Sequence, residues 1–152
     1  DKREAFTYLP HKDSLKDYLT VEENLINWLE ITNNQLNYKK FDESLKFFKL
    51  HEISQDLLGN LSQGQRKKVS LTKLLLTNSK LWILDEPFNG LDLNSSKKAE
   101  NMIQDHKKKG GSILLASHIN MNIQGSKKIF IKNFSKRFQK KISQFNSWED
   151  FK

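Results

Sequence analysis

Two adjacent carboxylates, Asp85 and Glu86, follow the apolar run at residues 81–84. A second apolar run, at residues 113–116, is followed after one residue by His118. A carboxylate oxygen is a ligand that Mg²⁺ prefers, and a second carboxylate can orient or deprotonate a water that attacks a phosphate. This combination suits phosphoryl transfer, in which catalysis consists mostly of positioning and charge compensation.

A short motif, LSQGQ, supplies a third polar element at residues 61–65. Ser62 and Gln65 have the spacing of a capping box, which predicts a helix that begins here and runs to about residue 77. A serine, Gly64 and open backbone N–H groups at a helix N-terminus can bind an anion. The motif therefore adds a second set of groups suited to a phosphate.

Both apolar runs lack the polar alternation of a half-exposed strand. Continuous runs of this length predict strands buried on both faces of a parallel sheet that is covered by helices. In open α/β sheets, ligands bind at the carboxyl ends of the strands. We therefore expect Asp85, Glu86 and His118 to face one site.

Capping and apolar spacing predict the remaining elements. Thr20 and Glu23 form a second capping box, which predicts a helix at residues 21–31. We also expect a helix at 42–50, a helix that includes 99–106 and ends at 110–111, a strand at 127–132 and a short helix near Trp148. We interpret Trp82, His51 and His106 as structural residues.

The composition limits the class of protein. The 152 residues have the length of one domain and carry a formal net charge of +8. Short basic runs occur at 66–68, 107–109 and 136–141, and we interpret them as solvated surfaces rather than as a stripe that binds nucleic acid. The absence of cysteine excludes disulfides and thiolate metal sites. No apolar run approaches the roughly 20 residues that span a bilayer.

Four motifs, in this order, resemble those of an ABC-type nucleotide-binding domain. LSQGQ followed by RKKVSLTKLLL is similar to the signature motif and its helix, and WILDEP is similar to the Walker B strand with its catalytic glutamate. Residues 89–92 resemble the D-loop, and residues 116–118 resemble the segment of the switch histidine. The resemblance implies an α/β fold: a partial, P-loop NTPase-like ABC nucleotide-binding domain with a parallel sheet core and a small helical subdomain.

A finer similarity is to the ATP-binding subunit of the cytochrome c maturation transporter, the CcmA-like or haem-exporter ATPase family. It is carried by LWILDEPF, by the short helical insert that opens with LTVEENL, and by GGSILLASH. The Q-loop of the wider family generally has glutamine where this chain has His11, in YLPH, as cytochrome maturation members do. The similarity runs from about residue 6 to residue 134.

The resemblance implies a role for each motif residue, with ATP and Mg²⁺ as cofactors. Asp85 is expected to coordinate Mg²⁺, Glu86 to act as general base or to polarise the attacking water, and His118 to contact the γ-phosphate. The residues expected to bind the γ-phosphate of ATP held by an opposing subunit are Ser62, Gln63, Gly64 and Gln65. Asp92 is expected at that dimer interface, and His11 takes the position of the Q-loop residue.

The resemblance also implies a division of the chain. Residues 1–134 are expected to form the partial nucleotide-binding domain, with the helical and signature subdomain at about 13–78 and the Walker B and switch part at 80–134. Residues 135–152 form a basic tail. No lysine in the printed sequence is followed by serine or threonine, so the P-loop motif G-x-x-x-x-G-K-[ST] is absent from it. In the family this motif precedes the Q-loop, and we expect this polypeptide alone to bind ATP poorly and to be inactive.

The expected partners are a membrane-spanning permease subunit and a second nucleotide-binding domain, with no direct nucleic acid. The helical layer is the expected docking surface, with Trp28 or Phe48 as apolar contacts. The protein would then be a peripheral membrane protein on the ATP-containing side, either the matrix face of the mitochondrial inner membrane or the cytoplasmic face of a bacterial one. Two alternatives stay open: a soluble ABC-type ATPase that acts on nucleic acid or the ribosome, and a remnant that does not hydrolyse ATP.

Overall fold

The computed structural model describes residues 6–32, 34–118 and 123–129. The chain divides into two units, residues 1–122 and 123–152, and all of the helices and strands below lie in the first. Residues 127–129 are not in a strand, so this part of the predicted strand at 127–132 is wrong. The rest of that strand, the helix near Trp148 and the basic tail fall outside the described residues.

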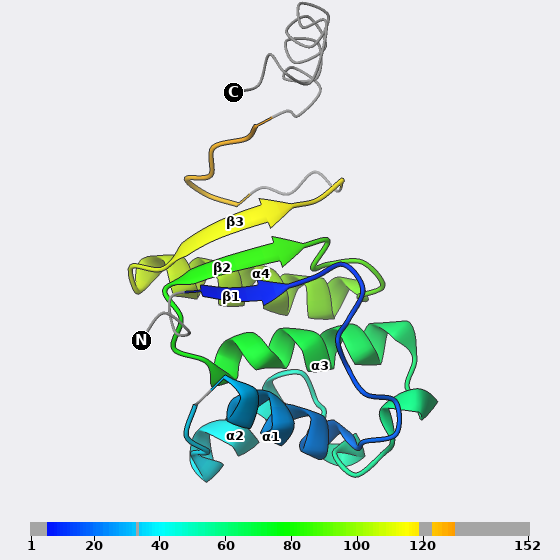
Figure 1. Cartoon of the computed structure of the whole chain (residues 1–152). Coiled ribbons are helices and arrows are strands. Elements are labelled where there is room, and N and C mark those ends of the chain that lie inside the picture. Colours follow the sequence, from blue (N-terminus) through cyan, green and yellow to red (C-terminus); the bar gives the residue numbers. More distant parts are fainter. Residues whose placement is uncertain (1–5, 33, 119–122, 130–152) are drawn as a thin grey trace, which may run out of the picture. The chain divides into compact units, whose positions relative to one another are not determined.

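A parallel sheet of three strands, in the order β1-β2-β3, forms one layer of the first unit (Figure 1). The strands are β1 (Phe6–Leu9), β2 (Leu81–Asp85) and β3 (Ser112–Ala116). Leu84 lies opposite Leu9 on one side and Leu115 on the other. The predicted parallel sheet is confirmed, and because the strands are parallel, all three carboxyl ends lie at one edge.

Four α-helices accompany the sheet: α1 (Val21–Ile31), α2 (Tyr38–Phe47), α3 (Gln63–Leu76) and α4 (Leu93–Lys108). Two 3₁₀ turns, η2 (His51–Ile53) and η3 (Leu58–Asn60), lie between α2 and α3. Both predicted capping boxes, at the starts of α1 and α3, are present. In contrast, α2 begins four residues before the predicted start, because the side chain of Asn37 accepts a hydrogen bond from the Lys40 N–H and caps the helix there.

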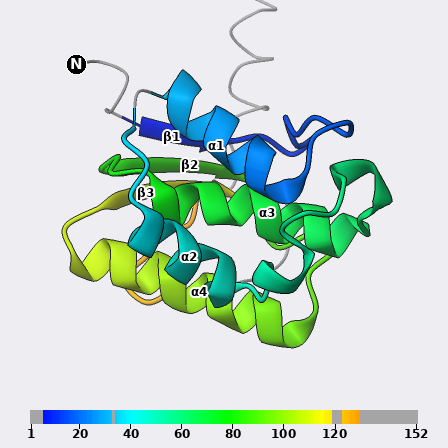
Figure 2. The ribbon, with the colours of Figure 1, turned by 90° about the horizontal axis from the view of Figure 1, so that it is seen from below.

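The helices lie on one face of the sheet, as two views at right angles show (Figures 1 and 2). α3 contacts β1 as well as α1 and α2, whereas α4 packs against β3. The core side chains between these layers are fully or almost fully buried: Leu9, Val21, Leu25, Leu29, Phe41, Leu45, Leu58, Val69, Leu71, Leu74, Trp82, Leu84, Ala99 and Ile103. Among the described residues, no helix is both long enough and apolar enough to cross a bilayer.

The prediction that the strands are buried on both faces is wrong. In β2 the side chains of Trp82 and Leu84 are buried, while those of Leu81 and Ile83 are only half-buried. In β3 the side chain of Leu114 is 61% exposed. The physical reason is that α3 and α4 cover a single face, and no helix in the described part of the chain covers the other.

An aromatic stack joins α4 to the sheet. The rings of Trp82 and His106 are stacked with centroids 3.7 Å apart, and Nε2 of His106 lies 3.1 Å from the carbonyl oxygen of Lys80. A Cβ atom on Gly111 would lie 2.1 Å from Nε2 of His106, so glycine is needed where the chain leaves α4. These contacts support the structural interpretation of Trp82 and His106.

A buried lysine, Lys73, lies on α3 beside Trp28 of α1. The residue Lys73 is only 3% exposed, and its ammonium group lies 4.7 Å from the ring centroid of Trp28 and 3.5 Å from Oγ of Ser14. Burial lowers the pKa of Lys73 from its ordinary value of 10.5 to about 8, and the charge of Asp13 only partly opposes this shift. The charged form of Lys73 is therefore poorly solvated in the folded chain.

This shift predicts a pH-dependent stability. Between about pH 8 and 10.5 the unfolded chain keeps the Lys73 proton while the folded chain has released it, so the free energy of unfolding rises with pH. Replacing Lys73 with methionine should remove this contribution, which is at most about 1.4 kcal/mol per pH unit. Urea unfolding of both proteins from pH 7.5 to 10.5 measures the difference in slope.

The control is Lys46→Met, because the Lys46 side chain is 59% exposed. This variant should keep the pH slope of the natural chain. If Lys73→Met shows the same slope as Lys46→Met, the burial of Lys73 does not control its proton.

Candidate functional site

The polar residues that follow the strands lie at the carboxyl edge of the sheet. His11 comes two residues after the end of β1, Asp85 ends β2, and His118 comes two residues after the end of β3. Asp85 lies opposite Ala116 in the parallel register, and the backbone N–H of Glu86 donates to the Ala116 carbonyl at 2.9 Å. This register brings the residues after β2 beside those after β3.

Glu86 and His118 are in direct contact at this edge. Oε1 of Glu86 accepts a hydrogen bond from the His118 backbone N–H at 2.8 Å and lies 2.9 Å from Nδ1 of the same residue. The hydroxyl of Ser117 donates to Oε2 of Glu86 at 3.2 Å. The side chain of Glu86 is 16% exposed and that of His118 is 69% exposed, so the imidazole borders solvent while the carboxylate is held behind it.

These contacts set the charge of Glu86. Burial acts to raise its pKa, but the hydrogen bonds from the His118 side chain and backbone, and then the one from Ser117, outweigh burial and hold the pKa below its ordinary value. Glu86 is therefore an ionised carboxylate at neutral pH. Such a group accepts hydrogen bonds and can orient a water, which is one of the two chemical roles expected for it.

The backbone of Glu86 is strained. Its φ angle is +47°, in the left-handed region that residues other than glycine rarely occupy. Backbone strain of this kind costs on the order of 1 kcal/mol or more and persists only where surrounding contacts hold it. Here the turn that follows contains the fully buried Pro87 and the buried Phe88.

A second group of predicted residues lies at the N-terminus of α3. Oγ of Ser62 accepts from the Gln65 N–H at 3.2 Å, and Oε1 of Gln65 accepts from the Ser62 N–H at 2.9 Å. The N–H groups of Gln63 and Gly64 occupy the first helical turn, where no intrahelical acceptor exists. The capping box thus provides acceptors for the N–H groups of Ser62 and Gln65. The N–H groups of Gln63 and Gly64 are left pointing out of the helix end.

The second group also includes the turn that precedes α4. A Cβ atom on Gly64 would lie 2.6 Å from the carbonyl oxygen of Gly90, so only glycine lets α3 approach this turn. Gly90 has a φ angle of +78°, which glycine adopts without strain. The close contact places the end of α3 directly on the segment at 89–92.

Asp92 caps α4 beside this contact. Its two carboxylate oxygens accept from the backbone N–H and the hydroxyl of Ser95, both at 2.8 Å, and Nζ of Lys68 lies 3.1 Å from Oδ2. The hydrogen bonds from Ser95, followed by the contact with Lys68, hold the pKa of Asp92 well below its usual range. Asp92 is therefore a helix cap in this chain, whatever it contacts in an assembly.

The structure contradicts the interpretation of the basic run 66–68 as a solvated surface. Nε and Nη2 of Arg66 contact the two carboxylate oxygens of Asp13 at 3.1 and 2.9 Å, and Nη1 contacts Oδ1 of Asp17 at 2.6 Å. The Arg66 side chain is only 20% exposed. Burial acts to raise the pKa of Asp13, but the hydrogen bonds and charge of Arg66 lower it overall. Arg66 thus fixes the segment after His11 to α3, because its planar fork matches a carboxylate in two places.

The sequence by itself does not identify these partners. The signal was available in part, because three basic residues directly follow the LSQGQ motif on the first turns of a helix. Their partners could not be identified, since Asp13 lies 53 residues away from Arg66 in the chain.

The predicted residues form two groups. Glu86 and His118 meet at the sheet edge beside Asp85, while Ser62, Gln63, Gly64, Gln65 and Asp92 surround the N-terminus of α3. His11 is exposed, and within the described ranges no hydrogen bond or ion pair joins it to Glu86 or His118. The part of the chain that the structure describes contains no group of three or more potential metal ligands.

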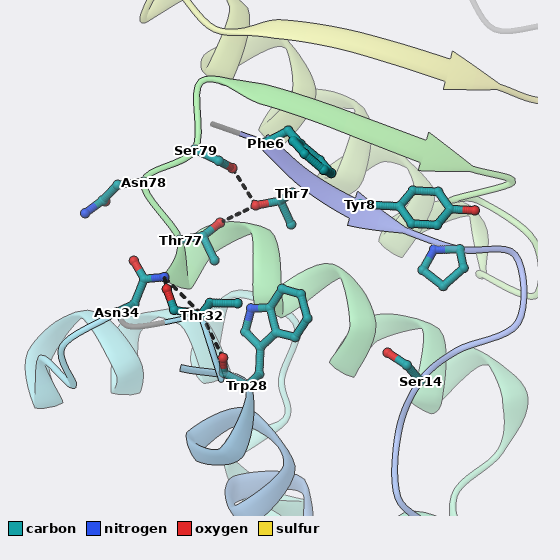
Figure 3. Close-up of a pocket in the computed structure, with 11 residues that line it drawn as sticks. Phe6, Thr7, Tyr8, Ser14, Trp28, Thr32, Asn34, Thr77, Asn78 and Ser79 are labelled. Carbon is teal, nitrogen blue, oxygen red and sulfur yellow. Dashed lines mark hydrogen bonds between the residues drawn. The ribbon is translucent and has the colours of Figure 1, made fainter. Parts of the chain in front are cut away.

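A cavity of about 380 Å³ opens elsewhere, between β1, α1 and the loop before β2 (Figure 3). Its lining residues are Phe6, Thr7, Tyr8, Pro10, Ser14, Trp28, Thr32, Asn34, Thr77, Asn78 and Ser79, none of which is a predicted site residue. Trp28 therefore lines an accessible hollow, as a docking contact must. Phe48 is only 3% exposed and stacks edge-on against Phe47, so it cannot serve as a docking contact.

Comparison with known proteins identifies the family of this chain. The family model of the ABC transporter matches residues 1–89, and the chain belongs to this family. The predicted family and fold class are thereby confirmed. The chain is similar to cytochrome c biogenesis ATP-binding export protein CcmA of Roseobacter denitrificans, with 33% identity over 121 residues, and to the protein of the same name from Reclinomonas americana, with 32% identity over 139 residues.

The chain covers only part of these relatives. The first alignment includes 80% of this chain but 57% of the Roseobacter protein, and the second includes 90% of this chain and 63% of the Reclinomonas protein. Among solved structures, the ATP-binding subunit of an ABC transporter matches with a TM-score of 0.67 and 30% identity, over 78% of this chain and 50% of that one. An ATP-binding protein from Pyrococcus furiosus, at 24% identity, shares the fold with a TM-score of 0.69 over 78% of this chain and 59% of its own.

The contact of Gly64 with Gly90 yields a stability prediction. Alanine is intrinsically favoured over glycine inside a helix by about 1 kcal/mol. Gly64→Ala should nevertheless lower the free energy of unfolding, by about 1–3 kcal/mol, because its Cβ would overlap a backbone oxygen. Gln63→Ala, at the neighbouring exposed position, is the control and should change stability by no more than about 0.5 kcal/mol. Equal stability of Gly64→Ala and the natural chain in urea unfolding would show that the two segments are not held together.

Proposed function

We propose that the chain is part of the ATP-binding, energy-coupling subunit of an ABC transporter that acts in cytochrome c biogenesis, in the export or handling of haem. The complete subunit hydrolyses ATP in a head-to-tail dimer. The observation that carries this proposal is the contact of Glu86 with His118 at the carboxyl edge of a parallel sheet, in a chain whose relatives are named cytochrome c biogenesis ATP-binding export proteins.

The edge of the sheet is the hydrolytic half of the proposed site. Mg²⁺ is commonly held by one or two carboxylates together with phosphate oxygens and waters, and Asp85 fits that donor set at the end of β2. When bound, Mg²⁺ would neutralise charge on the phosphates. Glu86, ionised and fixed by His118 and Ser117, orients the attacking water. Nδ1 of His118 lies against Glu86, which leaves Nε2 of the exposed ring as the nitrogen that would contact a phosphate oxygen.

The N-terminus of α3 is the other half of the proposed site, and it acts on ATP held by the opposing subunit. The outward N–H groups of Gln63 and Gly64, together with the positive end of the helix dipole, suit a γ-phosphate. The hydroxyl of Ser62 accepts from Gln65, so its own hydrogen stays available to donate. Gln65 acts by holding this geometry, and Asp92 presents the neighbouring turn to the dimer interface.

The proposed partners are a second nucleotide-binding domain and a membrane-spanning permease subunit. The cavity lined by Trp28 is the proposed docking site for the permease. β1 forms one wall of this cavity, and His11 lies on the loop that follows β1. In this proposal the protein is peripheral to the membrane on the ATP-containing side, either the matrix face of the mitochondrial inner membrane or the cytoplasmic face of a bacterial one. The contacts of Arg66 and Lys68 with carboxylates weaken the nucleic-acid alternative, because they reduce the freely solvated basic surface.

Replacing Glu86 with glutamine in the complete gene tests the hydrolytic role. The amide keeps the shape of the carboxylate but loses its negative charge, so it can neither polarise the attacking water nor accept its proton, and ATP hydrolysis by the purified transporter should fall about 100-fold or more. Haem-stained c-type cytochromes should be lost from the cells. Glu30→Gln, at an exposed position of α1, is the control and should be without effect.

The outcomes separate the two levels of the proposal. Unchanged hydrolysis in Glu86→Gln would refute the catalytic role. Lost hydrolysis with normal cytochromes would leave the ATPase role intact and refute the role in cytochrome c biogenesis.

The docking site is tested with two tyrosines. Tyr8 lines the cavity and is 47% exposed, while Tyr18 is 73% exposed and lies outside the cavity lining (Figure 3). Tyr8→Ala should reduce co-purification of the permease with the tagged subunit at least about fivefold, because an apolar contact is lost. Tyr18→Ala should not. Equal recovery of the permease with both variants would place the docking surface elsewhere.

A further inference from the structure

Lys67 connects the two halves of the site within one chain. It lies on the second turn of α3, and its Nζ donates to the backbone carbonyl oxygen of Glu86 at 3.3 Å. Figure 1 shows why this contact forms: α3 begins on the side of the sheet toward which the strands point. The residue that follows Arg66 in the sequence therefore reaches the turn after β2.

Lys67 contacts the strained backbone of Glu86. The Glu86 carbonyl belongs to the residue whose φ angle is +47°, and that backbone conformation directs the side chain to His118. The Glu86 N–H is bonded to Ala116 on β3, so one side of the residue is anchored to the sheet. The contact from Lys67 anchors its carbonyl side to α3.

The surroundings of Lys67 favour a fixed ammonium group. Its side chain is half-buried, and burial lowers its pKa, while the charges of Asp13, Asp85 and Glu86 raise it in part. The charges of Asp13, on the loop after β1, and of Asp85 and Glu86, at and after the end of β2, thus act on this ammonium from two different elements. Attraction to these charges adds to the hydrogen bond that holds the ammonium group at the Glu86 carbonyl.

We propose that Lys67 is a positioning residue, which holds the backbone of Glu86 in its strained conformation and so keeps the Glu86 carboxylate in contact with His118. It acts from the helix that carries the phosphate-binding motif Ser62–Gln65, and it does not itself touch the reacting atoms. This role deepens the proposed function and rests on it for the catalytic consequence. The structural consequence is independent of that function.

The first test measures the structural consequence in the full chain, without ATP. The backbone N–H of His118 donates to Glu86, so amide hydrogen exchange followed by NMR reports how often that contact opens. In Lys67→Met, exchange at His118 should become at least about fivefold faster, while exchange at Val69, in the buried middle of α3, should stay the same. Lys97→Met, which removes a 72% exposed lysine, should change neither amide.

Three results bear on the proposal. Unchanged exchange at His118 in Lys67→Met overturns it, and so does a rise that is equal at His118 and Val69, because the effect is then general destabilisation. If Lys67→Met does not fold, Lys67→Arg takes its place: it keeps a donor and should preserve slow exchange at His118. Fast exchange in that folded variant also overturns the proposal.

The second test measures the catalytic consequence in the complete transporter. Lys67→Met should lower kcat for ATP hydrolysis about tenfold with KM for ATP changed less than twofold, and Lys67→Arg should recover most of kcat. A fall in kcat accompanied by a comparable change in KM contradicts the positioning role, and so does a failure of Lys67→Arg to recover kcat. If Glu86→Gln leaves hydrolysis intact, the proposed function fails, and the exchange result still decides whether Lys67 holds the turn.

Discussion

The burial of α3 is the constraint on which the other contacts of the site depend. The helix is covered by β1, α1 and α2, and Val69, Leu71 and Leu74 are all but inaccessible to solvent. Burying side chains of this size contributes roughly 1.5–3 kcal/mol each, which fixes the axis and rotation of the helix. Once α3 is fixed in this way, its first turns can only point at the loop after β1, the turn after β2 and the cap of α4.

This placement resolves an electrostatic conflict. The N-terminal end of a helix carries partial positive charge and disfavours cations, yet Arg66, Lys67 and Lys68 lie within the first two turns of α3. Each cation has a compensating acceptor: Arg66 contacts Asp13, Lys67 contacts the Glu86 carbonyl, and Lys68 contacts Asp92. The same contacts tie three separate segments to one helix, so the basic run holds these segments together.

Much of the fold could be predicted because its signals are local. The capping boxes at Thr20 and Ser62 involve residues three apart, and the apolar runs that form β2 and β3 are contiguous. β1 was not predicted, because a four-residue segment becomes a strand only through its pairing with β2. The expected burial of both sheet faces failed for a similar reason: which face a helix covers is a property of packing, and apolar runs alone do not specify it.

The sequence by itself determined the chemistry available and the family. The order of the LSQGQ, WILDEP and ASH segments and the residue types within them can be read from the chain without coordinates. Only the tertiary structure decided which of these residues meet. Glu86 reaches His118 across 32 residues and Lys67 reaches Glu86 across 19, whereas no hydrogen bond or ion pair in the described residues joins His11 to Glu86 or His118. The physical reason is that such contacts depend on strand register and helix rotation, and a shift of one residue in a strand turns every side chain to the opposite face.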